Sequence, residues 1–63
     1  MNVALKAARE KSGKTQAQVA REAKISQAQY QNIEYDKSKP RVDVAIRIAK
    51  ALGTTVESLF QES

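Results

Sequence analysis

Two matching helix-start signals, separated by barely one short helix, constrain the fold of this chain more than any other feature. Thr15 and Ser26 are residue types that cap helix N-termini, and Gln18 and Gln29 stand three residues after them. This spacing is the capping box, in which each of the two side chains accepts a hydrogen bond from the other residue's backbone N–H. Since the second box follows so soon after the first, the sequence predicts short helices joined by tight turns.

The remaining apolar residues are also spaced for helices. No window alternates apolar and polar residues for long enough to predict a strand. We therefore expect an all-α fold of five helices, with ends marked by caps such as Asn2 and by glycines such as Gly13. The first three predicted helices run from the Asn2 cap to about residue 12, over 16–23 and over 27–34. After a loop at 35–41, a fourth helix is predicted from 42 or 43 to 53, and a short fifth helix follows a cap at Thr54 or Thr55.

The predicted core combines many alanines with a modest set of larger apolar residues. The fourth helix is expected to bury a stripe that consists of Ile46, Ala49 and Leu52. The larger candidates for the core are Val3, Leu5, Val19, Ile25, Tyr30, Ile33, Val42, Val44, Ile46, Ile48, Leu52, Val56, Leu59 and Phe60.

The composition argues against catalysis. A chain of 63 residues supports one modest core, so residues 1–63 are expected to form a single domain. The chain has no Cys and no His, which removes disulfides, the usual zinc ligands, a thiol nucleophile and an imidazole base. We therefore expect no enzyme, metal, cofactor or small-molecule ligand. With no signal-peptide-like start and no apolar run of spanning length, we expect a cytoplasmic protein without a membrane segment.

Residues 16–33 hold the most informative pattern. Two predicted helices meet across a turn at Lys24, with Ala20 small where they would cross, and this arrangement is typical of a helix-turn-helix unit. Because each helical residue turns by about 100°, Tyr30 and Ile33 share the inward face of the second helix. The outward face carries Gln27, Ala28, Gln31 and Asn32.

This outward face, rich in amides, has two interpretations. It can be a neutral, solvated surface, or it can bind base edges in the major groove, where Gln and Asn pair with adenine and an Ala methyl contacts thymine. The net charge of +4 is too small to decide between them. Its distribution favours DNA, because Gln16 stands at a helix N-terminus and Lys37, Lys39 and Arg41 follow in the next loop. Such groups attract phosphates.

Several short motifs stand in a fixed order along the chain. They are Arg9-Glu10, Thr15-Gln16-x-x-Val19-Ala20, Ile25-Ser26, Ile33-Glu34, Pro40, and Ile48-Ala49-Lys50-Ala51-Leu52-Gly53 leading into Leu59-Phe60. In this order and spacing, the chain resembles the lambda-repressor-like helix-turn-helix family, which includes phage repressors, Cro proteins and Xre-type bacterial regulators. The resemblance extends from about Leu5 to Phe60 and implies a compact domain of five helices.

The resemblance also implies roles for the residues that match by position. Those implied to face base edges are Gln27, Ala28 and Asn32, with Gln31 a contact to base or backbone. Those implied to lie along phosphates are Gln16, Lys37, Ser38, Lys39 and Arg41, the last near the backbone or minor groove. Arg9 and Glu34 match an internal ion pair of the family. Val56, Leu59 and Phe60 lie near the homodimer contact of the family, although one chain could bury all three.

Three positions depart from the family pattern. Lys14 stands where the family has an apolar residue, and its stem is expected to cover the core while its ammonium stays in water. Lys24 and Asp36 stand where the family has glycines at turns. A positive φ at such a turn costs free energy for any residue other than Gly, and the cost is smaller for Asp than for Lys.

We therefore expect a sequence-specific double-stranded DNA-binding protein of bacterial or phage origin, associated with the nucleoid. Its expected role is that of a transcriptional repressor that acts as a dimer on a palindromic operator. The alternative is an antitoxin or antirepressor whose main partner is another protein and whose DNA binding is auxiliary.

Overall fold

The computed structural model describes residues 1–60, and these form five helices, as predicted. They are α1 (Val3–Ser12), α2 (Gln16–Glu22), α3 (Gln27–Glu34), α4 (Val42–Ala51) and α5 (Val56–Leu59). No strand occurs in this described part, so the predicted all-α class is confirmed. α2 and α4 each stop earlier than predicted, because Ala23 and Leu52 form their C-terminal caps.

The caps that the sequence marks form in the structure. The Asn2 side chain accepts a hydrogen bond from the Leu5 N–H at 3.0 Å, and Gly13 ends α1 with φ 75°. The Thr15 capping box forms with both of its bonds, whereas at Ser26 only the bond from the Gln29 N–H is present among the described contacts. Thr55 is the cap of α5. Local sequence therefore sets where most helices begin.

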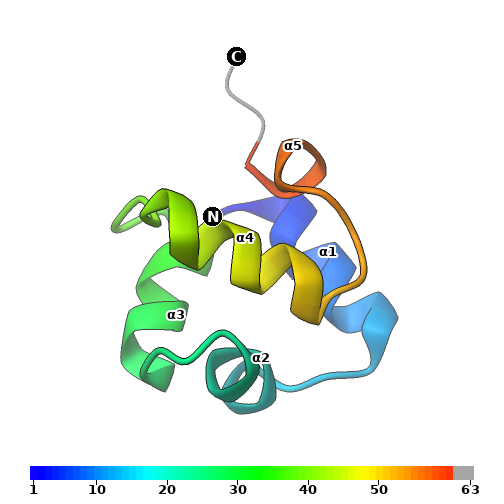
Figure 1. The fold of residues 1–63 in the computed structure, drawn as a ribbon, viewed down its shortest axis with the longest axis horizontal. Coiled ribbons are helices and arrows are strands. Elements are labelled where there is room, and N and C mark those ends of the chain that lie inside the picture. Colours follow the sequence, from blue (N-terminus) through cyan, green and yellow to red (C-terminus); the bar gives the residue numbers. More distant parts are fainter. Residues whose placement is uncertain (61–63) are drawn as a thin grey trace.

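The helices enclose one small core around α4. α2 and α3 pack against each other and α2 packs against α4, while α5 closes the opposite side against α1 and α4 (Figure 1). The fully buried large residues include Leu5, Val19, Tyr30 and Ile48. None of the helices within residues 1–60 is long and apolar enough to span a bilayer.

Part of the predicted core is wrong. Ile46 is 42% exposed, so the stripe of α4 predicted from Ile46, Ala49 and Leu52 is not the buried one. The buried face instead holds Val44, Ala45, Ile48 and Ala49. Leu52 is only partly buried, and Val3 and Val42, at the first turns of their helices, are largely exposed. Two of the four residues on the buried face of α4 are alanines, which allow neighbouring helices to pack closely.

Both turns that lack the family glycine adopt the glycine-like conformation. Lys24, between α2 and α3, has φ 61°, and Asp36, after α3, has φ 62°. The left-handed region costs a residue with a Cβ about 1–2 kcal/mol, and less for Asp, whose side chain tolerates it. The chain therefore keeps the tight turn geometry despite both substitutions.

Two basic side chains tie α4 to the helix-turn-helix unit. The Lys14 ammonium donates to the Ala51 carbonyl at 2.6 Å and to Glu22 at 2.8 Å. The ammonium therefore bonds both α4 and α2, while the Lys14 side chain stays 31% exposed and in contact with water. The Arg47 guanidinium donates to the Ala23 carbonyl at 2.7 Å. Each side chain thus bonds a backbone carbonyl at a helix C-terminus, where positive charge is favourable.

Candidate nucleic-acid interface

The unit formed by α2, the turn at Lys24 and α3 places one face of α3 on the outside of the molecule. Tyr30 and Ile33 are buried, which fixes the rotation of α3 against the core. The side chains left exposed are Gln27, Ala28, Gln29 and Asn32. Gln27, Ala28 and Asn32 of the predicted base-reading face are thus outward, and Gln29 is exposed beside them.

Glu34, the last residue of α3, lies at the centre of a buried hydrogen-bond network. Its carboxylate accepts bonds from Arg9 Nε at 2.8 Å, from the Tyr30 hydroxyl at 3.0 Å and from the Gln16 amide. Only 1% of Glu34 is exposed. The ion pair that the resemblance implies between Arg9 and Glu34 is therefore present, and it fixes the C-terminal end of α3 to α1.

The network keeps Glu34 ionised. Burial raises the pKa of its carboxyl, but the hydrogen bonds from Arg9, Gln16 and Tyr30 and the charge of Arg9 outweigh burial and lower the pKa. Burial raises the pKa of the Tyr30 hydroxyl, and the neighbouring Glu34 carboxylate raises it further. Tyr30 therefore stays protonated and acts as a donor.

Gln16 and Gln31 are joined to this network. Gln16 Nε2 donates to Glu34 Oε2 and, at a longer 3.4 Å, to the Tyr35 hydroxyl. Gln16 Oε1 accepts a bond from Gln31 Nε2 at 3.1 Å. Gln31 is consequently half-buried rather than fully exposed. The structure thus brings Gln16 together with α3, but both of its amide hydrogens face protein acceptors instead of solvent.

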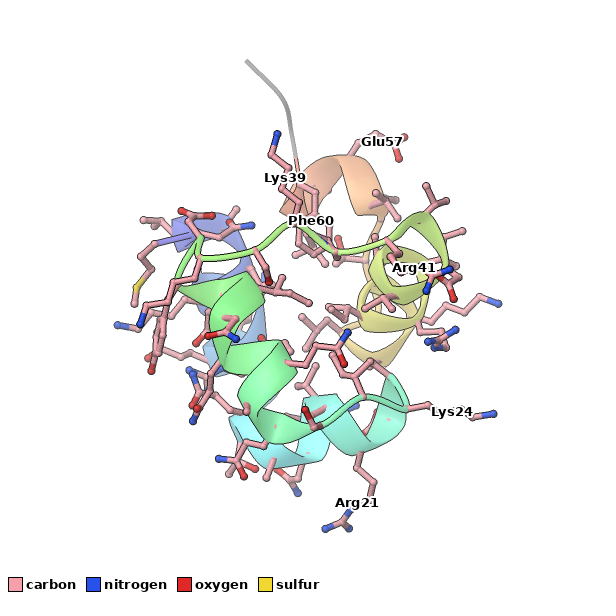
Figure 2. The ribbon with its side chains drawn as sticks, turned by 90° about the vertical axis from the view of Figure 1, so that its left-hand side faces the viewer. Arg21, Lys24, Lys39, Arg41, Glu57 and Phe60 are labelled. Atoms are coloured by element: carbon pink, nitrogen blue, oxygen red, sulfur yellow. The ribbon has the colours of Figure 1, made fainter. Side chains whose placement is uncertain are left out.

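The cations that the sequence assigns to phosphates surround α3 without entering the network. Lys37, Ser38, Lys39 and Arg41 are all exposed on the loop that follows α3. Figure 2 faces the side of the molecule on which α3 lies, and it shows Lys39 and Arg41 extending from that loop. Arg21 and Lys24 extend at the other end, near α2 (Figure 2). The outward face of α3, itself uncharged, therefore has basic groups beyond both ends.

Only some of the apolar side chains at α5 that lie near the family's homodimer contact are exposed in this structure. Leu59 is 2% exposed and packs in the core, which agrees with the alternative that one chain buries it. Val56 and Phe60 are partly exposed. Together with Pro40 and the exposed Val42 they line an open hollow of about 600 Å³. This hollow lies between the basic loop, the start of α4 and α5.

The fold and the exposed α3 face together define a helix-turn-helix domain. A family model described as helix-turn-helix matches residues 5–59, which is most of the chain. The chain belongs to this family, the Cro/CI-type helix-turn-helix proteins, which are DNA-binding transcription regulators. The comparison with curated proteins found no match.

Proposed function

We propose that the protein regulates transcription by binding one double-stranded DNA sequence through α3. The observation that carries this proposal is the pairing of an uncharged amide face on α3 with exposed basic groups on the loop that follows it. Base edges give sequence information, whereas phosphates give affinity and position without it. The amide face of α3 is suited to base edges, and the basic loop is suited to phosphates.

The side chains proposed to contact bases are Gln27, Ala28 and Asn32. Gln27 and Asn32 can each form two hydrogen bonds with an adenine edge, and the Ala28 methyl can pack against a thymine methyl. Gln31 was assigned to the same group, but its amide nitrogen already donates one hydrogen to Gln16 and its side chain is half-buried. We therefore restrict the base-reading set to the three exposed residues.

The residues proposed to bind phosphates are Lys37, Ser38, Lys39 and Arg41. Each Lys or Arg that neutralises a phosphate releases a counterion, so affinity would fall as salt rises. The Arg41 side chain is 86% exposed and stands 4.0 Å from Asp43, whose side chain is 60% exposed. Water screens such a pair, and Arg41 remains free to bind DNA.

We further propose that two copies bind a palindromic operator as a dimer. α3 has eight residues and can reach only a few base pairs, so specificity calls for two half-sites about 34 Å apart. One domain measures 28 × 21 × 20 Å, so two domains side by side cover a longer stretch of DNA than this spacing. The second copy would cover the hollow lined by Pro40, Val42, Val56 and Phe60.

A dimer seated on an operator would act as a repressor by excluding other proteins from the same DNA. The proposed site of action is the nucleoid in the bacterial cytoplasm. The competing role is that of a module that binds another protein, as an antitoxin or antirepressor does.

Selection from a random-sequence duplex pool tests the proposal. Enrichment of a palindrome, with affinity that falls steeply between about 50 and 200 mM salt, supports it.

A variant in the hollow tests the proposed dimer. Val42→Asp would place a charge in the hollow and is expected to yield monomers in sedimentation and weaker binding to the full palindrome, with binding to a half-site unchanged. The matched control is Ile46→Asp, one turn further along α4 and outside the lining of the hollow. No enrichment of any sequence would favour the protein-binding role.

A further inference from the structure

The orientation of the Gln16 amide is fixed by chemistry. The ionised Glu34 carboxylate can only accept hydrogen bonds, so the Gln16 nitrogen must face it, and the Gln16 oxygen must face the donating Gln31. One hydrogen of the Gln16 nitrogen then binds Glu34 and the other points to the Tyr35 hydroxyl. No hydrogen of this amide remains for a phosphate.

The Tyr35 hydroxyl is in the opposite situation. Its oxygen accepts from Gln16, and none of its contacts within residues 1–60 takes its own hydrogen. Tyr35 is 40% exposed and stands at the C-terminal cap of α3, directly before the basic loop. The free O–H therefore lies beside Gln16 at the N-terminus of α2, on a residue whose backbone leads directly into the basic loop.

We propose that the Tyr35 hydroxyl donates a hydrogen bond to a backbone phosphate of the DNA, and that Gln31 is a positioning residue for this contact. The proposal rests on the proposed DNA binding. Gln31 donates to Gln16, and Gln16 donates in turn to Tyr35. Bonds in such a chain polarise one another in the same direction, which strengthens the last donor.

The role thus assigned to Gln31 differs from base reading in a measurable way. A base-reading residue changes the preference at one base pair when it is removed. A residue that positions a phosphate donor changes affinity for every sequence alike. Because Tyr35 is uncharged, its phosphate contact releases no counterion, and the salt dependence of binding stays the same when the hydroxyl is lost.

The test measures the affinity of Tyr35→Phe for the selected operator, for its single-base variants and at several salt concentrations. A hydrogen bond to a charged group contributes about 1.5–3 kcal/mol, so we expect binding about 10-fold weaker or more for every sequence. The melting temperature and the salt slope should match those of the unaltered protein. Tyr30→Phe removes the buried tyrosine hydroxyl instead, and is expected to lower the melting temperature without changing affinity.

A double-mutant cycle tests the role of Gln31. Gln31→Ala alone should weaken binding several-fold for all sequences, and it should add little to the loss already caused by Tyr35→Phe. An operator affinity of Tyr35→Phe equal to that of the unaltered protein would overturn the proposal, as would a Gln31→Ala variant that relaxes the preference at one base pair. If the unaltered protein selects no DNA at all, the proposed function itself fails, which is a different result from either.

Discussion

Replacing Glu34 by alanine probes the connection between α1 and α3 most directly. The change removes one carboxylate that accepts hydrogen bonds from Arg9, Tyr30 and Gln16. The Tyr30 hydroxyl, completely buried, would lose its partner. The Arg9 guanidinium, only 14% exposed, would keep just its 3.2 Å bond to the Lys14 carbonyl. A buried donor and a largely buried charge would thus lose their acceptor together.

The expected cost is large for so small a domain. Removing one partner of a buried ion pair costs about 3–5 kcal/mol. Folded domains are stable by roughly 0.05–0.15 kcal/mol per residue, or about 3–9 kcal/mol for a chain of this length. Glu34→Ala is therefore expected to lose most of the free energy of unfolding. Glu34→Gln keeps the volume and can accept from Arg9, so it should fall between alanine and the unaltered protein.

Thermal and urea unfolding, followed by circular dichroism, measure this loss. The matched control is Glu22→Ala, which removes a carboxylate that pairs with Lys14 where both side chains are substantially exposed. Exposed pairs contribute only about 0–1 kcal/mol. A Glu34→Ala curve that coincides with that of the unaltered protein, or a shift no larger than that of Glu22→Ala, would refute the structural role of the pair. In the fraction that remains folded, base preference should be unchanged.

Three further predictions concern stability. Lys24→Gly should raise the free energy of unfolding by about 1 kcal/mol in urea unfolding, because it relieves the positive φ; an unchanged or lower value would contradict the strain. Lys14→Met keeps the apolar stem but removes the bonds to Ala51 and Glu22. It should lower the free energy of unfolding by about 1 kcal/mol, and an unchanged value would mean that these bonds contribute nothing to stability. The pKa of Glu34 is lowered, so its ionised carboxylate stabilises the fold at pH values above the ordinary pKa of 4.5, and this stabilisation is lost as the pH falls below that value. The pKa of Tyr30 is raised, so its protonated hydroxyl stabilises the fold at pH values below the ordinary pKa of 10.0, and this stabilisation is lost as the pH rises above that value. Melting temperature against pH should therefore decline on both sides of that range, and Tyr30→Phe should remove the part of the alkaline decline that comes from Tyr30.

Local signals were sufficient to predict the helices of this chain. Capping residues such as Asn2 and Thr15 act within one turn of the backbone, so their effect can be predicted from neighbours in the sequence. Gly13 ends α1 for a similarly local reason. The burial of Tyr30 also followed from its spacing to Ile33. Fold class and most helix starts therefore needed no tertiary information.

Residues whose roles depend on a distant partner were predicted less well. Helical spacing assigned Ile46 to a buried stripe with Ala49 and Leu52, yet Ile46 is 42% exposed. The buried face of α4 instead holds Val44, Ala45, Ile48 and Ala49. No sequence signal shows that the Ala51 carbonyl lies beside the Lys14 ammonium, since 37 positions separate them. Packing between helices decides both outcomes, and it overrides the local pattern.

The same limit applies to the candidate site. The exposure of Gln27, Ala28 and Asn32 followed from helical geometry alone. The internal hydrogen bonds of Gln16 and Gln31 did not, because they depend on how α2 crosses α3. The contact of the Tyr35 hydroxyl depends on the same crossing, because its partner Gln16 belongs to α2.

The central claim is that α3 reads bases while the following loop binds phosphates, and one comparison tests it most directly. Selection from a random duplex pool is carried out with the unaltered protein, with Asn32→Ala and with Lys39→Ala, followed by affinity measurements at several salt concentrations. Asn32→Ala is predicted to lose about 1–3 kcal/mol of discrimination at one or two base pairs and to keep the salt slope. Lys39→Ala is predicted to weaken all sequences alike and to reduce the salt slope by about 1. Uniform weakening by Asn32→Ala, with the selected sequence unchanged, would contradict the claim.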